Sequence, residues 1–175
     1  LDEVRKACQA LEEPVPLGFT LSSIRDTALA LNYAHSFRDA RGRALLVIHR
    51  DVSGKNVMVT YEGTTRLLDF GIAKSLGRTG GSATSAGMVK GTRGYMSPEQ
   101  VQGEPLDPRT DVFSLGVVLH EGLSGQRLFA RESLAEEKQA VLEEVEPPSR
   151  ANPQVSPALD RVTLKALARN RDQRF

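Results

Sequence analysis

The chain contains a single cysteine, Cys8, among its 175 residues. This excludes an intrachain disulfide framework and any zinc site built on cysteines. An excess of positive charge is also missing, because 23 lysine and arginine residues face 22 aspartate and glutamate residues, and the net charge is +1. Proteins that bind nucleic acids or membrane surfaces usually carry a basic stripe, so we expect neither partner here.

Long apolar runs are missing as well. No stretch approaches the roughly 18 apolar residues that a membrane-spanning helix needs, and no signal peptide is visible. We therefore expect no membrane segment in this chain. The first residue is Leu1 rather than methionine, and from this we expect the chain to be a piece of a longer protein.

The residues that are present indicate a globular, mostly α-helical protein, with 39% hydrophobic and 26% charged residues. Helical patterns occur in five segments, which are residues 1–11, 20–37, 110–123, 134–145 and 156–168. Two strand-like segments, residues 57–60 and 66–68, flank a turn that contains Gly63, which predicts a small β-hairpin. Residues 75–90 are dominated by glycine, serine and threonine, which is typical of a flexible linker.

Three short oxygen-bearing side chains lie on either side of this hairpin. Asp51 and Asn56 are five positions apart on one loop, and Asp69 follows thirteen residues after Asn56, where the second strand ends. Because the hairpin folds the chain back, we expect Asn56 and Asp69 to lie side by side. Two adjacent oxygen ligands suit a hard cation such as Mg²⁺, and Asp51 is left free to accept a proton.

The motifs around these residues resemble those of the protein kinase family. His49-Arg50-Asp51 with Asn56, followed by Asp69-Phe70-Gly71, is similar to the kinase catalytic loop and magnesium motif. Three further resemblances follow in the same order along the chain, at residues 91–99 (Gly-Thr-Arg-Gly-Tyr-Met-Ser-Pro-Glu), 111–116 (Asp-Val-Phe-Ser-Leu-Gly) and 171–175 (Arg-Asp-Gln-Arg-Phe). Five motifs in the right order over nearly the whole chain are a far stronger signal than any one of them.

The resemblance implies a mainly α fold, the C-terminal lobe of a bacterial eukaryotic-like Ser/Thr protein kinase. A small β-hairpin in this lobe would carry the catalytic and magnesium loops. The lobe would span residues 1–175, with the activation segment at residues 69–99. The chain contains no Gly-x-Gly-x-x-Gly loop and no Val-Ala-Ile-Lys strand. We therefore expect the N-lobe to be a partner supplied by the parent protein, and the fragment alone to be inactive.

The resemblance also implies roles in a reaction that uses ATP and Mg²⁺. Asp51 would orient the hydroxyl of a protein substrate and accept its proton. Asn56 and Asp69 would hold Mg²⁺ on the phosphates. Met58, on the hairpin, would form part of the floor under adenine, and packing in the core is the alternative for this side chain.

Other roles concern activation and stability. Arg50 would pair with a phosphate on the activation segment. The candidate phosphorylation sites are Thr79, Ser82, Thr84 and Ser85. Thr92 occupies the position at which the family uses a threonine to brace the catalytic loop. Glu99 and Arg174 would form a buried ion pair, and Asp111 would brace the backbone of the catalytic loop.

The substrate class depends on a departure from the family pattern. Ser53 stands where Ser/Thr kinases usually carry a lysine, and Lys55 stands where tyrosine kinases often carry an arginine. Thr92, after Gly91, favours a Ser/Thr kinase. The resemblance also implies that the domain works in the cytoplasm, even if the parent is membrane-anchored. The alternatives are a non-catalytic docking lobe and a small-molecule phosphotransferase. The first does not need Asp51, Asn56 and Asp69, and the second lacks an activation segment of this kind.

Overall fold

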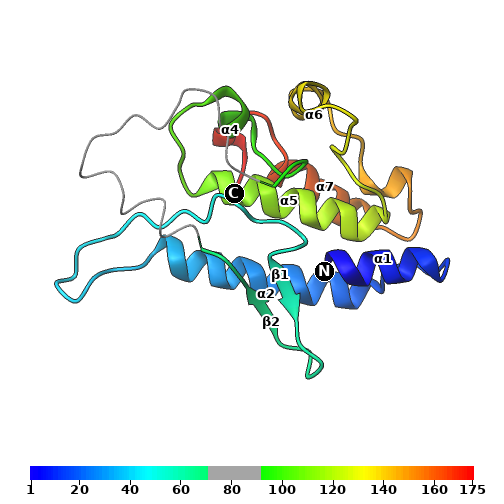
Figure 1. Ribbon diagram of the computed structural model, residues 1–175, viewed down its shortest axis with the longest axis horizontal. Helices are drawn as coiled ribbons and strands as arrows, with labels where there is room; N and C mark the ends of the chain where they lie inside the picture. The colour runs from blue at the N-terminus through cyan, green and yellow to red at the C-terminus, as the bar shows by residue number, and fades with distance from the viewer. Residues whose placement is uncertain (71–91) are drawn as a thin grey trace.

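The computed structural model describes residues 1–70 and 92–175 (Figure 1). The elements are, in chain order, α1 (Asp2–Ala10), α2 (Leu17–His35), β1 (Val57–Val59), β2 (Thr65–Leu67), α4 (Pro98–Gln102), α5 (Arg109–Ser124), α6 (Leu134–Val141), η2 (Pro148–Arg150), α7 (Pro157–Ala166) and η3 (Arg171–Gln173). The glycine- and serine-rich stretch and its four candidate phosphorylation sites lie outside the described residues. Among those that are described, no helix has the length and apolar character to cross a bilayer.

Helix α5 is the centre of the molecule, with α2 packed against one side and α7 against another (Figure 1). Its sequence predicts this place, because apolar residues occur all round the helix and such a helix has to be buried. Phe113 and Val117 have no exposed surface, and Val118 is 5% exposed. The expected mostly helical core built on this segment is confirmed.

Two glycines let the neighbouring helices approach α5 closely. A Cβ atom on Gly116 would lie 2.9 Å from Cβ of Ala166 in α7, and one on Gly122 would lie 2.6 Å from Cγ2 of Thr20 in α2. Real Cβ atoms essentially never come this close to another heavy atom. Glycine at these positions therefore sets the helix spacing, and α2 in turn supports the hairpin, which packs against it.

The hairpin is antiparallel, with Val57 opposite Leu67 and Val59 opposite Thr65. Strand β1 is one residue shorter than the predicted segment 57–60, and β2 is shifted by one residue from the predicted segment 66–68. Side chains alternate along β1, so that Val57 is fully buried while Met58 is 42% exposed. Met58 is therefore not buried in the core of the residues that the structure describes.

Helix ends differ from the sequence prediction by a few residues. Helix α2 begins directly after Pro16 rather than at Thr20. Helix α6 ends at Val141 rather than at residue 145, because the residues that follow include Glu143 and Glu144, and negative charge is unfavourable at a helix C-terminus. Helix α7 begins as predicted, with Ser156 accepting a hydrogen bond from the backbone N–H of Leu159.

Candidate active site

The loop that carries Asp51 joins the end of α2 to β1 and is hydrogen-bonded to α5. Asp111, fully buried near the start of α5, accepts hydrogen bonds from the backbone N–H groups of His49 and Arg50, both at 2.8 Å. The Nε2 atom of His35 in α2 lies 2.8 Å from the same carboxylate. The expected brace from Asp111 is therefore present. A buried carboxylate with several donors fixes the backbone just before Asp51.

His49 ties this loop to the end of the hairpin. Its Nε2 atom lies 2.8 Å from the carbonyl oxygen of Leu68, and its Nδ1 atom accepts a hydrogen bond from the backbone N–H of Asp51 at 3.3 Å. Together these contacts indicate the tautomer with the proton on Nε2. The ring also packs edge-on against Phe70, with centroids 4.7 Å apart. The segment that contains Asp69 is thereby held next to the Asp51 loop.

The carboxylate of Asp51 is oriented by two donors. Its Oδ1 atom accepts a hydrogen bond of 2.7 Å from the backbone N–H of Thr92, and its Oδ2 atom accepts one of 3.3 Å from Nδ2 of Asn56. Residue 92 therefore does contact the catalytic loop, although the contact uses the backbone rather than the threonine hydroxyl. The carboxylate is half-buried, so part of it faces solvent.

Asn56 and Asp69 offer oxygen atoms of the kind that Mg²⁺ binds. The amide nitrogen of Asn56 donates a hydrogen bond of 2.8 Å to the backbone carbonyl oxygen of Asp51. This leaves the side-chain oxygen, Oδ1, for a cation. The backbone N–H of Leu68 donates to the carbonyl oxygen of Asn56 at 2.8 Å, so Asp69 follows directly after the residue paired with Asn56. This donor set fits a hard cation.

A cation here would need further ligands. No group of three histidine, cysteine, aspartate or glutamate residues in the described parts of the chain could hold a metal ion. Magnesium commonly takes one or two protein ligands and completes its shell with water and phosphate oxygens. The pair formed by Asn56 and Asp69 matches that behaviour and does not match a self-sufficient metal centre.

Arg50 directly precedes Asp51, and its backbone N–H donates to Asp111. Its backbone has φ of +68°, in the left-handed region that residues other than glycine seldom adopt. Its Nε atom is buried and makes no hydrogen bond within residues 1–70 and 92–175. A buried guanidinium N–H without an acceptor can donate a hydrogen bond to an anion.

Glu99 and Arg174 form the predicted buried ion pair. Two parallel hydrogen bonds join them, with Nη1 to Oε1 at 2.7 Å and Nη2 to Oε2 at 3.0 Å. Thr110 donates a further hydrogen bond of 2.8 Å to Oε1 of Glu99. Burial alone would raise the pKa of Glu99, but the hydrogen bonds and charge of Arg174 outweigh it and hold this pKa below its usual range. The pair fastens α4, and with it the chain around Thr92, to the C-terminal segment.

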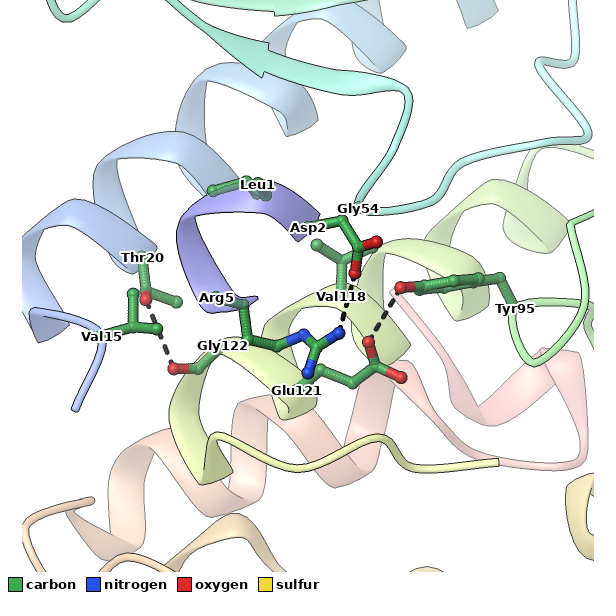
Figure 2. Close-up of a pocket in the computed structure, with 10 residues that line it drawn as sticks. All are labelled: Leu1, Asp2, Arg5, Val15, Thr20, Gly54, Tyr95, Val118, Glu121 and Gly122. Atoms are coloured by element: carbon green, nitrogen blue, oxygen red, sulfur yellow. Dashed lines mark hydrogen bonds and ion pairs between the residues drawn. The ribbon is translucent and has the colours of Figure 1, made fainter. Parts of the chain in front are cut away.

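A further cluster of polar side chains, which we did not predict from the sequence, surrounds a cavity next to the loop that carries Asp51 (Figure 2). This small cavity of about 30 Å³ is lined by residues of α1, α2 and α5 together with loop residues that include Gly54 and Tyr95. The hydroxyl of Tyr95 donates to Glu121 at 2.8 Å, and burial raises the pKa of both groups. Asp2 lines the same cavity, and its backbone N–H donates to the carbonyl oxygen of Gly54 at 3.0 Å. The cluster is thereby hydrogen-bonded to the loop that carries Asp51.

Comparison with known proteins identifies the fold that this site belongs to. The sequence profile of the protein kinase domain family matches residues 17–175. The chain belongs to the protein kinase family. The mainly α fold with a small hairpin, which the resemblance implied, is the one observed for this kinase chain.

Individual relatives agree with this assignment. The chain is 42% identical over 163 residues to the serine/threonine-protein kinase PknB of Mycolicibacterium smegmatis, and 39% identical over 165 residues to PknB of Mycobacterium tuberculosis. It is also 41% identical over 162 residues to the tyrosine-protein kinase MasK of Myxococcus xanthus. These alignments cover 92–94% of this chain, and the kinase chain spans about a quarter (25%) of the length of each relative.

Proposed function

We propose that the protein carrying this chain is a protein kinase that transfers the γ-phosphoryl group of ATP to a serine or threonine hydroxyl of a protein substrate. Residues 1–175 would supply the C-lobe, with the activation segment at residues 69–99. The observation that carries the proposal is the arrangement around Asp51. Its carboxylate is held by the N–H of Thr92 and the amide of Asn56, next to the oxygen donors expected to hold Mg²⁺.

The residues of the site suit a reaction that depends on positioning and charge neutralisation rather than on covalent chemistry. Bound ATP with Mg²⁺ would supply the phosphoryl group. Asp51 would accept a hydrogen bond from the substrate hydroxyl and take its proton as the new oxygen–phosphorus bond forms. Asn56 and Asp69 would contribute oxygen ligands to the cation, and Met58, exposed on the hairpin, would contact the adenine ring.

Arg50 and Thr92 have supporting roles in this proposal. The buried Nε of Arg50, without an acceptor in the described chain, suits a phosphate carried by the activation segment. Such a phosphate would hold that segment in place and keep the N–H of Thr92 on the carboxylate of Asp51. Removal of the phosphate is expected to lower activity for this reason.

Serine or threonine as the acceptor is favoured over tyrosine by the sequence around Thr92 and by the PknB relatives, which are named as serine/threonine kinases. MasK, named as a tyrosine kinase, is similar to this chain to almost the same degree. Ser53 is fully buried and Lys55 is exposed. Of these two side chains, Lys55 is therefore the one open to solvent, and we expect it to be the one that a substrate could contact.

The proposal also covers what surrounds the lobe. Residues 1–175 contain no glycine-rich phosphate loop, so ATP binding is expected to need an N-lobe from the parent protein, and the chain alone is expected to be inactive. The domain is expected to work in the cytoplasm, whether or not the parent has a membrane anchor. A non-catalytic docking lobe is the alternative function.

The magnesium assignment can be tested by Asp69→Asn in the full-length protein. We expect phosphoryl transfer to fall by about 100-fold or more, because a metal clamp on the phosphates is worth several kcal/mol. Part of the loss should be recovered at raised Mg²⁺ concentration. The rate of transfer from labelled ATP as a function of Mg²⁺ concentration measures both effects.

Asp26→Asn is the matched control, because Asp26 pairs with the exposed Arg25 of the same helix at 2.8 Å. It should leave the rate and the Mg²⁺ dependence unchanged. An Asp69→Asn variant with the wild-type rate and the wild-type Mg²⁺ dependence would refute the assignment. A wild-type protein that transfers no phosphate would instead favour the docking lobe.

A further inference from the structure

The backbone carbonyl just before Asp51 is held by a side chain that none of the motifs above includes. The Nε2 atom of Gln100 in α4 donates a hydrogen bond of 2.9 Å to the carbonyl oxygen of Arg50. On the other side of the same residue, the N–H of Arg50 donates to Asp111 at 2.8 Å. Both the N–H and the C=O of Arg50 are thus hydrogen-bonded to side chains, and its backbone has φ of +68°.

A non-glycine residue in this region costs about 1–3 kcal/mol and persists only where its surroundings impose it. Asp111 fixes the peptide that precedes Arg50, and Gln100 fixes the peptide that leads into Asp51. The second of these peptides sets the direction in which the Asp51 side chain leaves the backbone. Loss of the Gln100 contact would therefore free the peptide that aims the carboxylate.

The orientation of the Gln100 amide is itself fixed. Its Oε1 atom accepts a hydrogen bond of 3.0 Å from the backbone N–H of Ser97, and its own backbone N–H donates to the Ser97 hydroxyl at 3.4 Å. These two bonds form a capping box at the start of α4. Because the amide oxygen is used there and the side chain is only 6% exposed, the NH₂ group has to face Arg50.

We propose that Gln100 is a positioning residue for phosphoryl transfer, which couples the end of the activation segment to the direction of the Asp51 carboxylate. The inference rests on the proposed kinase function. A capping box accepts either glutamine or glutamate at this position. Only glutamine can also donate to the carbonyl of Arg50, so the choice of amide over acid has a reason beyond the helix cap.

Gln100→Glu separates the two roles. A glutamate keeps the acceptor for the N–H of Ser97 and adds negative charge at a helix N-terminus, which is favourable. It places a carboxylate oxygen against the carbonyl oxygen of Arg50, where the donor was. We expect the turnover number kcat of the full-length kinase to fall between about 10-fold and 100-fold, in line with the cost of a slightly misplaced reacting group. KM for ATP should stay within about twofold of the wild-type value.

The hydrogen exchange of the catalytic loop, residues 48–56, supplies a readout that does not depend on activity. We expect exchange there to be faster in Gln100→Glu. Glu136→Gln is the matched control, because Ser133 and Glu136 form an equivalent, solvent-exposed capping box on α6. This control should match wild type in kcat, thermal midpoint and exchange.

Ser97→Ala tests whether loss of the α4 cap alone would account for a lower kcat. It removes the hydroxyl that caps α4 and leaves the amide of Gln100 facing Arg50, so it should lower the thermal midpoint and reduce kcat far less than Gln100→Glu. If Ser97→Ala reduced kcat as much as Gln100→Glu, or if Gln100→Glu matched wild type in kcat and exchange, the positioning role would be overturned. A wild-type protein with no phosphoryl transfer would overturn the proposed function, and the positioning role with it.

Discussion

Asp51→Asn in the intact kinase is expected to lower phosphoryl transfer by about 10²–10⁴-fold, the range associated with a positioned acid–base group. An amide cannot accept the proton of the substrate hydroxyl. It would also set its NH₂ group against a donor, either the N–H of Thr92 or the Nδ2 atom of Asn56, which lie 2.7 Å and 3.3 Å from the carboxylate oxygens. Nucleotide affinity should stay close to wild type, because Asp51 is not among the proposed ligands of ATP and Mg²⁺.

The measurement is the rate of transfer from labelled ATP, combined with nucleotide affinity from calorimetry. Asp39→Asn is a suitable control, since Asp39 belongs to an exposed turn where it binds Arg43. The control should transfer phosphate at the wild-type rate. Near-normal turnover in Asp51→Asn would remove Asp51 from the reaction.

Arg174→Ala is expected to lower the free energy of unfolding of the kinase domain by about 3–5 kcal/mol. The substitution leaves the carboxylate of Glu99 buried without its counter-ion. It also removes hydrogen bonds from Arg174 to the backbone carbonyls of Ala168 and Arg109, at 2.7 Å and 3.0 Å. Urea denaturation of variant and wild type at neutral pH gives the difference directly.

Arg150→Ala provides the contrast, because Arg150 and Glu146 are 3.9 Å apart and are 76% and 70% exposed. A pair of this kind contributes about 0–1 kcal/mol. A similar stability for Arg174→Ala and Arg150→Ala would show that the buried pair does not hold the lobe together.

The pH dependence of the same pair has a definite sign. The native pKa of Glu99 lies below its unfolded value of about 4.3, so the ionised pair stabilises the folded state above that pH. The contribution is lost as the pH falls through the native pKa. The stability difference between wild type and Arg174→Ala should therefore shrink below about pH 4.

Much of the fold could be predicted because its signals are local and strong. The all-round apolar pattern of α5 required a buried helix, and Ser156 followed by proline marked the start of α7. The short hairpin followed from β-type segments around Gly63. For the site, the spacing of Asp51, Asn56 and Asp69 was enough to group them on one loop and hairpin.

Other features depend on the path of the chain and could not be predicted in this way. Helix α4 has five residues, too few for apolar periodicity to show. Its signal was Ser97 with Gln100 three positions later, a capping pattern that sequence analysis missed. The bond to Asp51 comes from the backbone of Thr92, so no residue type reports it. The positive φ of Arg50 is imposed by its partners, because arginine does not favour it.

The most direct test of the central claim is to incubate the full-length protein with γ-labelled ATP, Mg²⁺ and a protein substrate, and to identify the labelled amino acids after hydrolysis. We expect phosphoserine and phosphothreonine, with the label lost in Asp51→Asn. Label on phosphotyrosine alone would contradict the proposed acceptor. No label on any protein would contradict the claim that this lobe serves a protein kinase reaction.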